Sequence, residues 1–185
     1  RSRLAFAGMS FGGATSATSC RLVDACRAAV NLDGQNFDPG LYDGAVERPL
    51  LLMLSDWTQF SLFPGQPRDA DFSPNDLAYA PWREAGQDTD VLRVRLGGIR
   101  HLGFTDFVSL LQGPKRDERV GGIDADKATA AIGDLVLAFL DTHVRESDGE
   151  GARDGIERAI ARHPVLTRHV PTRVRAWVQS EGETP

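Results

Sequence analysis

The segment LAFAGMSFGGATS, residues 4–16, restricts the fold more than any other part of this sequence. Its first four residues are an apolar run that ends at Gly8, which is typical of a short buried strand. Small residues from Gly12 onward then begin a helical pattern. Ser10 stands between the two, at a sharp turn where neighbouring side chains would clash. The segment therefore predicts a strand, a tight turn and a helix in immediate succession.

The rest of the chain continues this alternation of strand and helix signals. Short apolar runs end at turn signals or glycines, and a later segment has apolar residues at helical spacing. The expected strands cover residues 27–34, 48–56 and 90–98, and the expected helices cover residues 12–24 and 123–144. Strand, helix, strand, helix, strand is the order of an α/β domain with a mainly parallel sheet flanked by helices.

Composition and charge limit the class of protein. The chain has 185 residues, of which 41% are hydrophobic and 25% charged, which suits one globular domain that needs no metal or disulfide for its core. No apolar run approaches the roughly 18 residues that span a bilayer. The net charge of -5, with Arg interspersed among acids, argues against a nucleic-acid partner. Cys20 and Cys26 are expected on different faces of one helix, as free buried residues.

The residues around Ser10 match the G-x-S-x-G nucleophile elbow, with one further glycine. Gly8 and Gly12 are expected to remove clashes at the turn, and Gly13 to let the helix pack close to the strand. The N-terminus of that helix would direct its dipole at a developing oxyanion. The backbone N–H of Phe11 is the predicted oxyanion-hole donor. Ser10 is therefore the candidate nucleophile.

A serine nucleophile needs a base, and the chain has four histidines. His143 is expected at the end of a long helix, where a cation favours the helix dipole. His163 and His169 are flanked by arginines in a polar tail, which is typical of solvated surface residues. His101 follows a strand and a Gly-Gly turn in LGGIRHLGFTDF, on the side of the sheet where active-site loops collect. His101 is therefore the candidate base.

Two carboxylates are candidates for the acid that orients the base. Asp33 in NLDG and Asp56 in LLMLSDW both end apolar strands. Both fit the chain order of serine, acid and histidine in α/β-hydrolases, and the commonest arrangement favours the strand that ends at Asp56. The motifs do not decide between them.

These segments resemble the C-terminal half of the plasma platelet-activating factor acetylhydrolase family of α/β-hydrolase lipases. The resemblance rests on GMSFGGATSA, NLDG, RPLLLMLSDW, RHLGFTDF and GIDADKATAAIGDLVLAFLDTHV, over roughly residues 4–145. It implies an α/β-hydrolase fold, with Asp33 as the acid and Asp56 as a neighbouring acid near the pocket. The family commonly has His where this chain has Met9, which concerns fine specificity. The resemblance also favours a secreted or periplasmic location.

The resemblance divides the chain into two parts. Residues 1–145 are expected to form the C-terminal half of an α/β-hydrolase domain, and residues 146–185 a linker and a helical tail. A hydrolase of this kind has about half of its sheet before the elbow strand, including the loop with the second oxyanion donor. We therefore expect the chain to be the C-terminal part of a larger protein. Its expected macromolecular partner is the N-terminal half of that protein or a second chain.

The expected function is hydrolysis of a carboxylic ester through an acyl-enzyme on Ser10, with no metal or organic cofactor. An aromatic-rich stretch from Trp57 to residue 82 is expected either to line or cover the substrate pocket or to pack over the sheet as an excursion of the chain. The candidate pocket residues are Trp57 and Phe60 from this stretch and Met9 from the elbow. The substrate would be a small-molecule or lipid ester, phospholipids included, and contact with a lipid surface would be peripheral. The alternatives are acyl transfer or thioester cleavage on the same triad, and a non-catalytic binding module or inactive hydrolase fragment.

Overall fold

One five-stranded sheet organises the part of the chain that the structure describes. The computed structural model describes residues 3–35, 38, 40–43, 46–56, 86, 90–145 and 150–169. The strands follow the order β1 (Leu4–Met9), β2 (Cys26–Leu32), β3 (Leu50–Leu54), β4 (Val91–Leu96) and β5 (Leu166–Arg168). The first four pair in parallel, and β5 pairs with β4 antiparallel. The predicted α/β fold with a mainly parallel sheet is confirmed.

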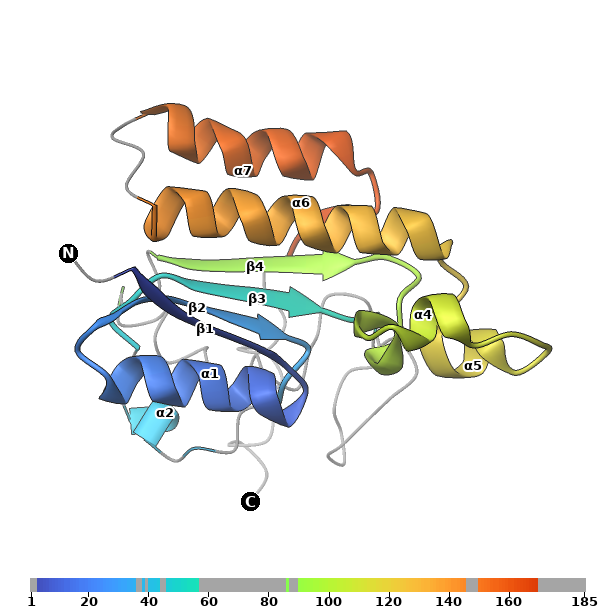
Figure 1. The fold of residues 1–185 in the computed structure, drawn as a ribbon, viewed down its shortest axis with the longest axis horizontal. Coiled ribbons are helices and arrows are strands. Elements are labelled where there is room, and N and C mark those ends of the chain that lie inside the picture. Colours follow the sequence, from blue (N-terminus) through green and yellow to red (C-terminus); the bar gives the residue numbers. More distant parts are fainter. Residues whose placement is uncertain are drawn as a thin grey trace, which may run out of the picture.

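Helices cover both faces of this sheet (Figure 1). On one side lie α1 (Phe11–Leu22) and the short α2 (Gly40–Asp43), and on the other lies α6 (Ala125–His143) with α7 (Glu150–Arg162) stacked on it. The remaining helical turns are η1 (His101–Phe104), α4 (Phe107–Leu110) and α5 (Arg116–Val120). They lie beyond the end of the sheet toward which the arrows of the parallel strands point.

The apolar run of β3 is continuous because both of its faces are buried. Leu51 and Met53 belong to the core cluster that includes Phe139 of α6. Leu52 points the other way and packs in a second cluster with Ala17 of α1. All five residues of β3 are at most 1% exposed, so β3 forms the centre of the core.

The two cysteines correct the prediction that both are free and lie in one helix. Cys20 and Cys26 form a disulfide with a Cα–Cα distance of 5.2 Å. The helix ends at Leu22, and Cys26 is already the first residue of β2. Because the chain reverses direction between the two residues, helical spacing does not apply to this pair. Both side chains are buried on the α1 face of the sheet.

The described part of the segment from residue 146 onward packs onto the sheet. The helix α7 packs against α6, and Leu166 of β5 pairs with Leu96 of β4. This pairing places His169 next to Arg95, with 3.0 Å between the imidazole Nδ1 and the guanidinium Nη2. His169 is only 7% exposed, so the prediction that it is a solvated surface residue is wrong. The division at residue 145 stays a prediction.

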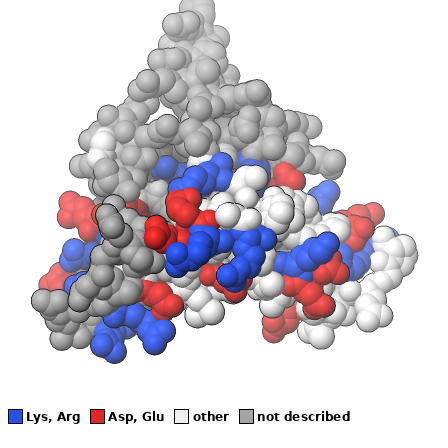
Figure 2. All heavy atoms as spheres, turned by 90° about the horizontal axis from the view of Figure 1, so that it is seen from above, with Lys and Arg blue, Asp and Glu red and all other residues white. Residues whose placement is uncertain are grey.

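Charged side chains of both signs lie next to each other on the molecular surface. The view in Figure 2 shows Lys and Arg side chains interspersed with Asp and Glu side chains over the described part of the chain. Ion pairs join α6 to α7, as between Arg162 and Asp134 at 2.9 Å. None of the helices in the described ranges combines the length and apolar character that a bilayer crossing demands.

Candidate active site

Ser10 occupies the tight turn between β1 and α1. Its backbone φ of 57° lies in the left-handed region that favours glycine, which is a strained conformation for a serine. The Ser10 N–H donates to the Leu32 carbonyl of β2 at 2.9 Å, and the Ser10 carbonyl accepts from the N–H of Ala14 at 3.1 Å. These bonds hold the strained residue between the end of a strand and the first turn of a helix, as the elbow motif predicts.

The glycines around Ser10 do not all have the same role. A Cβ at Gly8 would lie 2.4 Å from the backbone carbon and oxygen of Gly12, so no side chain fits there. A Cβ at Gly13 would lie 2.8 Å from the carbonyl oxygen of Gly8, which confirms the close approach of helix and strand. Apart from its chain neighbours and the backbone of its own helix, a Cβ at Gly12 would have no heavy atom of the described residues within 4 Å. The predicted steric need for glycine at position 12 is therefore wrong.

Three side chains from distant parts of the sequence meet at this turn. His101, on η1, places its Nε2 2.9 Å from the Oγ of Ser10. The Nδ1 of the same imidazole lies 2.7 Å from the Oδ2 of Asp33, which follows β2. A carboxylate only accepts hydrogen bonds, so Nδ1 carries the donated proton and Nε2 is left to accept from the serine hydroxyl. This arrangement of serine, imidazole and carboxylate can activate a nucleophile.

The residues of this group differ in solvent exposure: the carboxylate is buried and the imidazole is partly exposed. The side chain of Asp33 is 1% exposed, whereas that of His101 is 36% exposed. The hydrogen bond to Asp33 raises the pKa of His101 above its ordinary value of 6.5, and this effect outweighs the opposing effect of partial burial. The imidazolium that forms when His101 takes a proton is therefore stabilised by Asp33.

The Asp33 turn is fixed by two residues that the motif analysis did not single out. The amide of Asn31 donates to the carbonyl of Gly34 at 2.9 Å and accepts from its N–H at 2.6 Å. Ser55 donates to both carboxylate oxygens of Asp33, through its backbone N–H and its hydroxyl. The sequence signal for both residues is a polar side chain inside or directly after a buried apolar strand. Asn31 and Ser55 are 0% and 2% exposed.

Asp56 lies at the same end of the sheet but has different neighbours. Its Oδ1 is 3.8 Å from the Nη1 of Arg95, and its Oδ2 accepts from the N–H of Gly98 at 3.4 Å. His101 therefore contacts Asp33, whereas Asp56 contacts the turn that follows β4. Of the two carboxylates that the motifs left open, Asp33 is the one within hydrogen-bond distance of the imidazole.

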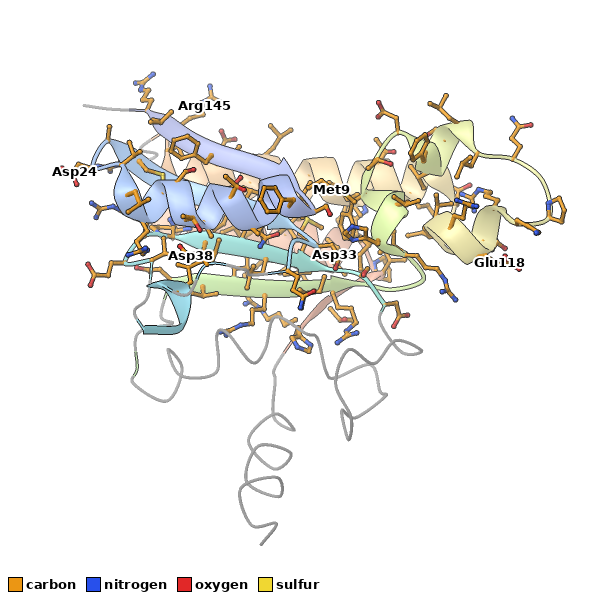
Figure 3. The ribbon with its side chains drawn as sticks, turned by 90° about the horizontal axis from the view of Figure 1, so that it is seen from below. Met9, Asp24, Asp33, Asp38, Glu118 and Arg145 are labelled. Atoms are coloured by element: carbon orange, nitrogen blue, oxygen red, sulfur yellow. A yellow bond between two sulfur atoms is a disulfide. The ribbon has the colours of Figure 1, made fainter. Side chains whose placement is uncertain are left out.

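The other predicted site residues are placed as follows. Phe11 is the first residue of α1, so its backbone N–H lies at the positive end of that helix beside Ser10. Met9 is the last residue of β1 and lies at the same end of the sheet as Asp33 (Figure 3). Trp57 and Phe60 lie outside the described residues. Their predicted place in the substrate pocket stays a prediction.

Hydrogen bonds to main-chain carbonyls fix the loop that carries His101. The guanidinium of Arg116 donates to the carbonyls of Gly121 and Ile123, each at 2.9 Å. The N–H of Ile123 in turn donates to the carbonyl of Gly98 at 3.3 Å, in the turn just before His101. The position of the imidazole thus depends on α5 as well as on β4.

The remaining histidines lie away from this group. His143 is the last residue of α6, as expected, and its ring packs against that of Phe139. The side chain of His163 is 15% exposed and its Nε2 lies 2.9 Å from an oxygen of Asp134, so the prediction that it is a solvated surface residue is wrong as well. This contact ties the end of α7 to α6. In the described ranges, no three His, Cys, Asp or Glu side chains gather closely enough to hold a metal ion.

Comparison with known proteins supports the fold. No protein-family model matches the sequence, and no curated protein sequence matches it either. Among solved structures, the chain is similar to a ferulic acid esterase from Streptomyces cinnamoneus, with a TM-score of 0.61 and 24% sequence identity. The match covers 88% of this chain and 45% of the esterase chain, so the chain spans less than half of that structure. The two proteins share their fold over this region.

Proposed function

We propose that this protein is a serine ester hydrolase, with Ser10 as nucleophile, His101 as general base and Asp33 as the acid that orients the base. The observation that carries the proposal is the unbroken pair of hydrogen bonds from Ser10 Oγ to His101 Nε2 and from His101 Nδ1 to Asp33 Oδ2. The strained φ of Ser10 adds support, because a strained serine at a strand-to-helix turn is the geometry of a nucleophile elbow. The similar solved structure is itself described as an esterase.

The mechanism follows from the protons that this geometry can move. Ser10 Oγ attacks the ester carbonyl carbon while His101 Nε2 takes the hydroxyl proton, and the buried Asp33 stabilises the imidazolium. Collapse of the tetrahedral intermediate expels the alcohol, which leaves with the proton from His101, and an acyl-Ser10 remains. Water then attacks the acyl carbon with the same base, which releases the carboxylic acid and restores the serine. The Phe11 N–H is the proposed donor to the oxyanion.

The proposed substrate is an ester with an apolar acyl or alcohol part. Two large apolar residues are next to the reacting groups in the chain: Phe11 directly follows Ser10 and is 70% exposed, and Leu102 directly follows His101. Phe107, on α4 beyond the same end of the sheet, is 47% exposed. Exposed apolar side chains favour an apolar ligand group, since its burial against them removes both from water. A lipid ester, as the lipase family resemblance implies, is one such substrate.

Covalent labelling of Ser10 tests the proposal. The full-length protein is treated with a fluorophosphonate probe, and the labelled peptide is located by mass spectrometry. We expect Ser10 to be labelled and Ser10→Ala to lose both the label and the hydrolysis of p-nitrophenyl acetate. Thr15→Ala is the matched control, because the hydroxyl of Thr15 is exposed and donates to the Phe11 carbonyl within α1. No label on Ser10 in a folded protein would refute the proposal.

The apolar preference is tested separately with a series of esters. Hydrolysis of p-nitrophenyl acetate, p-nitrophenyl octanoate and methyl ferulate is compared by kcat/KM, the last because of the esterase whose fold the chain shares. A higher kcat/KM for octanoate or ferulate than for acetate supports an apolar substrate. Equal values for all three would refute this part of the proposal and leave the triad unaffected.

A further inference from the structure

We propose that Ser55 is a positioning residue for the triad, which fixes the carboxylate of Asp33 in the orientation that His101 needs; this inference rests on the proposed function. The backbone N–H of Ser55 donates to Oδ1 of Asp33 at 2.8 Å. The hydroxyl of Ser55 donates to Oδ2 at 2.7 Å, the same oxygen that His101 Nδ1 approaches. A single residue therefore holds both oxygens of the acid.

The path of the backbone explains how Ser55 comes to bond both oxygens of Asp33. The strands β2 and β3 pair in parallel up to Leu32 and Met53, and the ladder continues with the N–H of Asp33 donating to the Met53 carbonyl at 2.8 Å. A regular parallel ladder would continue with the Ser55 N–H donating to the main-chain carbonyl of Asp33. Here Asp33 turns into the left-handed region, with a φ of 55°, and the Ser55 N–H donates to its side chain. The carboxylate thus takes the place of a strand carbonyl.

This arrangement removes the rotational freedom of the carboxylate. An aspartate held by one donor can turn about its Cβ–Cγ bond, because that torsion is broad. Two donors from Ser55, one on each oxygen, fix this torsion. The plane of the carboxylate then stays aligned with the Nδ1–H of His101, and the imidazole keeps the tautomer whose Nε2 can accept the Ser10 proton.

The hydroxyl of Ser55 also depends on Asp33. Ser55 is 2% exposed, and a hydroxyl buried this deeply needs a hydrogen-bond partner. The charged carboxylate is the partner that the structure gives it, which makes the bond stronger than one between neutral groups. Alanine at position 55 would keep the backbone N–H bond and remove only the bond to Oδ2, so Ser55→Ala isolates the contribution of the hydroxyl.

The experiment compares Ser55→Ala with a matched loss of another buried hydroxyl. Ser16 on α1 is 4% exposed and donates to the carbonyl of Gly12, away from Asp33, so Ser16→Ala is the control. The full-length protein is assayed for kcat and KM with p-nitrophenyl acetate and for the rate of fluorophosphonate labelling. The pKa of His101 is measured by NMR titration of the imidazole. Both serine variants are also made in an Asp33→Ala background.

Loss of a hydrogen bond to a charged group in the transition state predicts a kcat between about tenfold and a hundredfold lower for Ser55→Ala, with KM within about twofold. The pKa of His101 should fall toward its ordinary value, because a carboxylate that turns away supports the imidazolium less. In the Asp33→Ala background, Ser55→Ala should slow labelling less than about twofold further. Ser16→Ala should leave kcat and the His101 pKa unchanged.

Three results would overturn the role of Ser55. They are an unchanged kcat in Ser55→Ala, an unchanged or higher pKa of His101, and a full loss of rate in the Asp33→Ala background. The last result would mean that Ser55 acts through the fold and not through the acid. An unlabelled Ser10 in the wild-type protein would instead refute the proposed function, and the NMR titration would still decide whether Ser55 positions Asp33 against His101.

Discussion

Replacement of Asp33 by asparagine should disable the proposed triad, although the side chain keeps almost the same size and shape. In the structure, Asp33 accepts hydrogen bonds from His101 Nδ1, the Ser55 N–H and the Ser55 hydroxyl. An asparagine amide offers one acceptor oxygen, and its nitrogen only donates. Because the side chain is 1% exposed, the amide must satisfy these partners within the protein. Only two orientations of the amide fit the site.

Each orientation of the asparagine amide conflicts with one donor. If the amide oxygen accepts from the Ser55 N–H, the NH₂ group faces His101 Nδ1 and selects the tautomer that carries its proton on Nε2. That tautomer cannot accept the Ser10 proton. If the amide is reversed, its NH₂ group faces the buried Ser55 N–H, and two donors oppose each other. The first orientation avoids the buried clash, because the Ser55 hydroxyl can rotate and accept from the NH₂ group.

The size of the loss in kcat follows from the His101 tautomer that carries its proton on Nε2. An asparagine in place of the triad acid lowers kcat about 10⁴-fold in a serine protease with the same three roles. At about 1.4 kcal/mol for each factor of ten, this corresponds to about 5 kcal/mol of transition-state stabilisation. We expect Asp33→Asn to lose between about 10³ and 10⁴ in kcat, with a smaller change in KM.

The assay is steady-state hydrolysis of p-nitrophenyl acetate by the full-length protein, with Asp56→Asn as the matched control. Asp56 ends the neighbouring strand and contacts Gly98 and Arg95, so its substitution should cost less than about tenfold. Thermal melts show whether both variants fold. A folded Asp33→Asn protein with a kcat within tenfold of the wild type would refute the reasoning. A larger loss in Asp56→Asn would move the role of the acid to that residue.

Three further predictions concern the base, the elbow and the disulfide. Since His101 must be neutral to take a proton and its pKa is raised, kcat/KM should fall as the pH drops through a value above 6.5; an acid limb at or below 6.5 in the pH profile would contradict this. Gly8→Ala should abolish soluble folded protein, because its Cβ would lie 2.4 Å from the helix backbone. Gly12→Ala should fold, and a thermal melt should show a free energy of unfolding up to about 1 kcal/mol higher. Equal behaviour of the two variants would refute the steric argument. Replacement of Cys20 and Cys26 by alanine should lower the free energy of unfolding by about 2 kcal/mol in urea, given their separation of six residues, and alkylation of the unreduced wild type would disprove the bond.

Local sequence patterns carried most of the fold and part of the site. The apolar runs, the Asp-Gly turn after β2 and the small residues of α1 predict the first four strands in the right order, together with α1 and the long helix α6. The short helix α2 between β2 and β3 was not predicted, because its segment is rich in Gly, Pro and Asp. The sequence also predicted that Ser10 lies on a strained turn, because such a turn between a strand and a helix needs glycine within a few residues of it. His101 could be placed at the correct end of the sheet, since the carboxyl ends of parallel strands meet there.

The errors concern residues whose neighbours are distant in the sequence or lie across a chain reversal. The pairing of Cys20 with Cys26 depends on where α1 ends, and helical spacing cannot predict a helix end. The burial of His169 depends on β5, a three-residue strand too short to give a periodic signal. The wrong prediction for Gly12 has the same kind of cause: the space around its Cα depends on where the sheet lies relative to the turn, which the local sequence does not show.

By itself, the sequence determined that this chain forms a parallel sheet with a serine on a strained turn and a histidine on the loop after β4. The motifs alone left Asp33 and Asp56 open, and the family resemblance pointed to Asp33. The tertiary structure is what places Asp33, and not Asp56, within hydrogen-bond distance of His101, and only the tertiary structure shows that Ser55 holds its carboxylate. The physical reason is that both aspartates end parallel strands and have the same local pattern. Which of them meets the imidazole depends on strand register and on a single turn in the backbone at Asp33, where φ becomes positive.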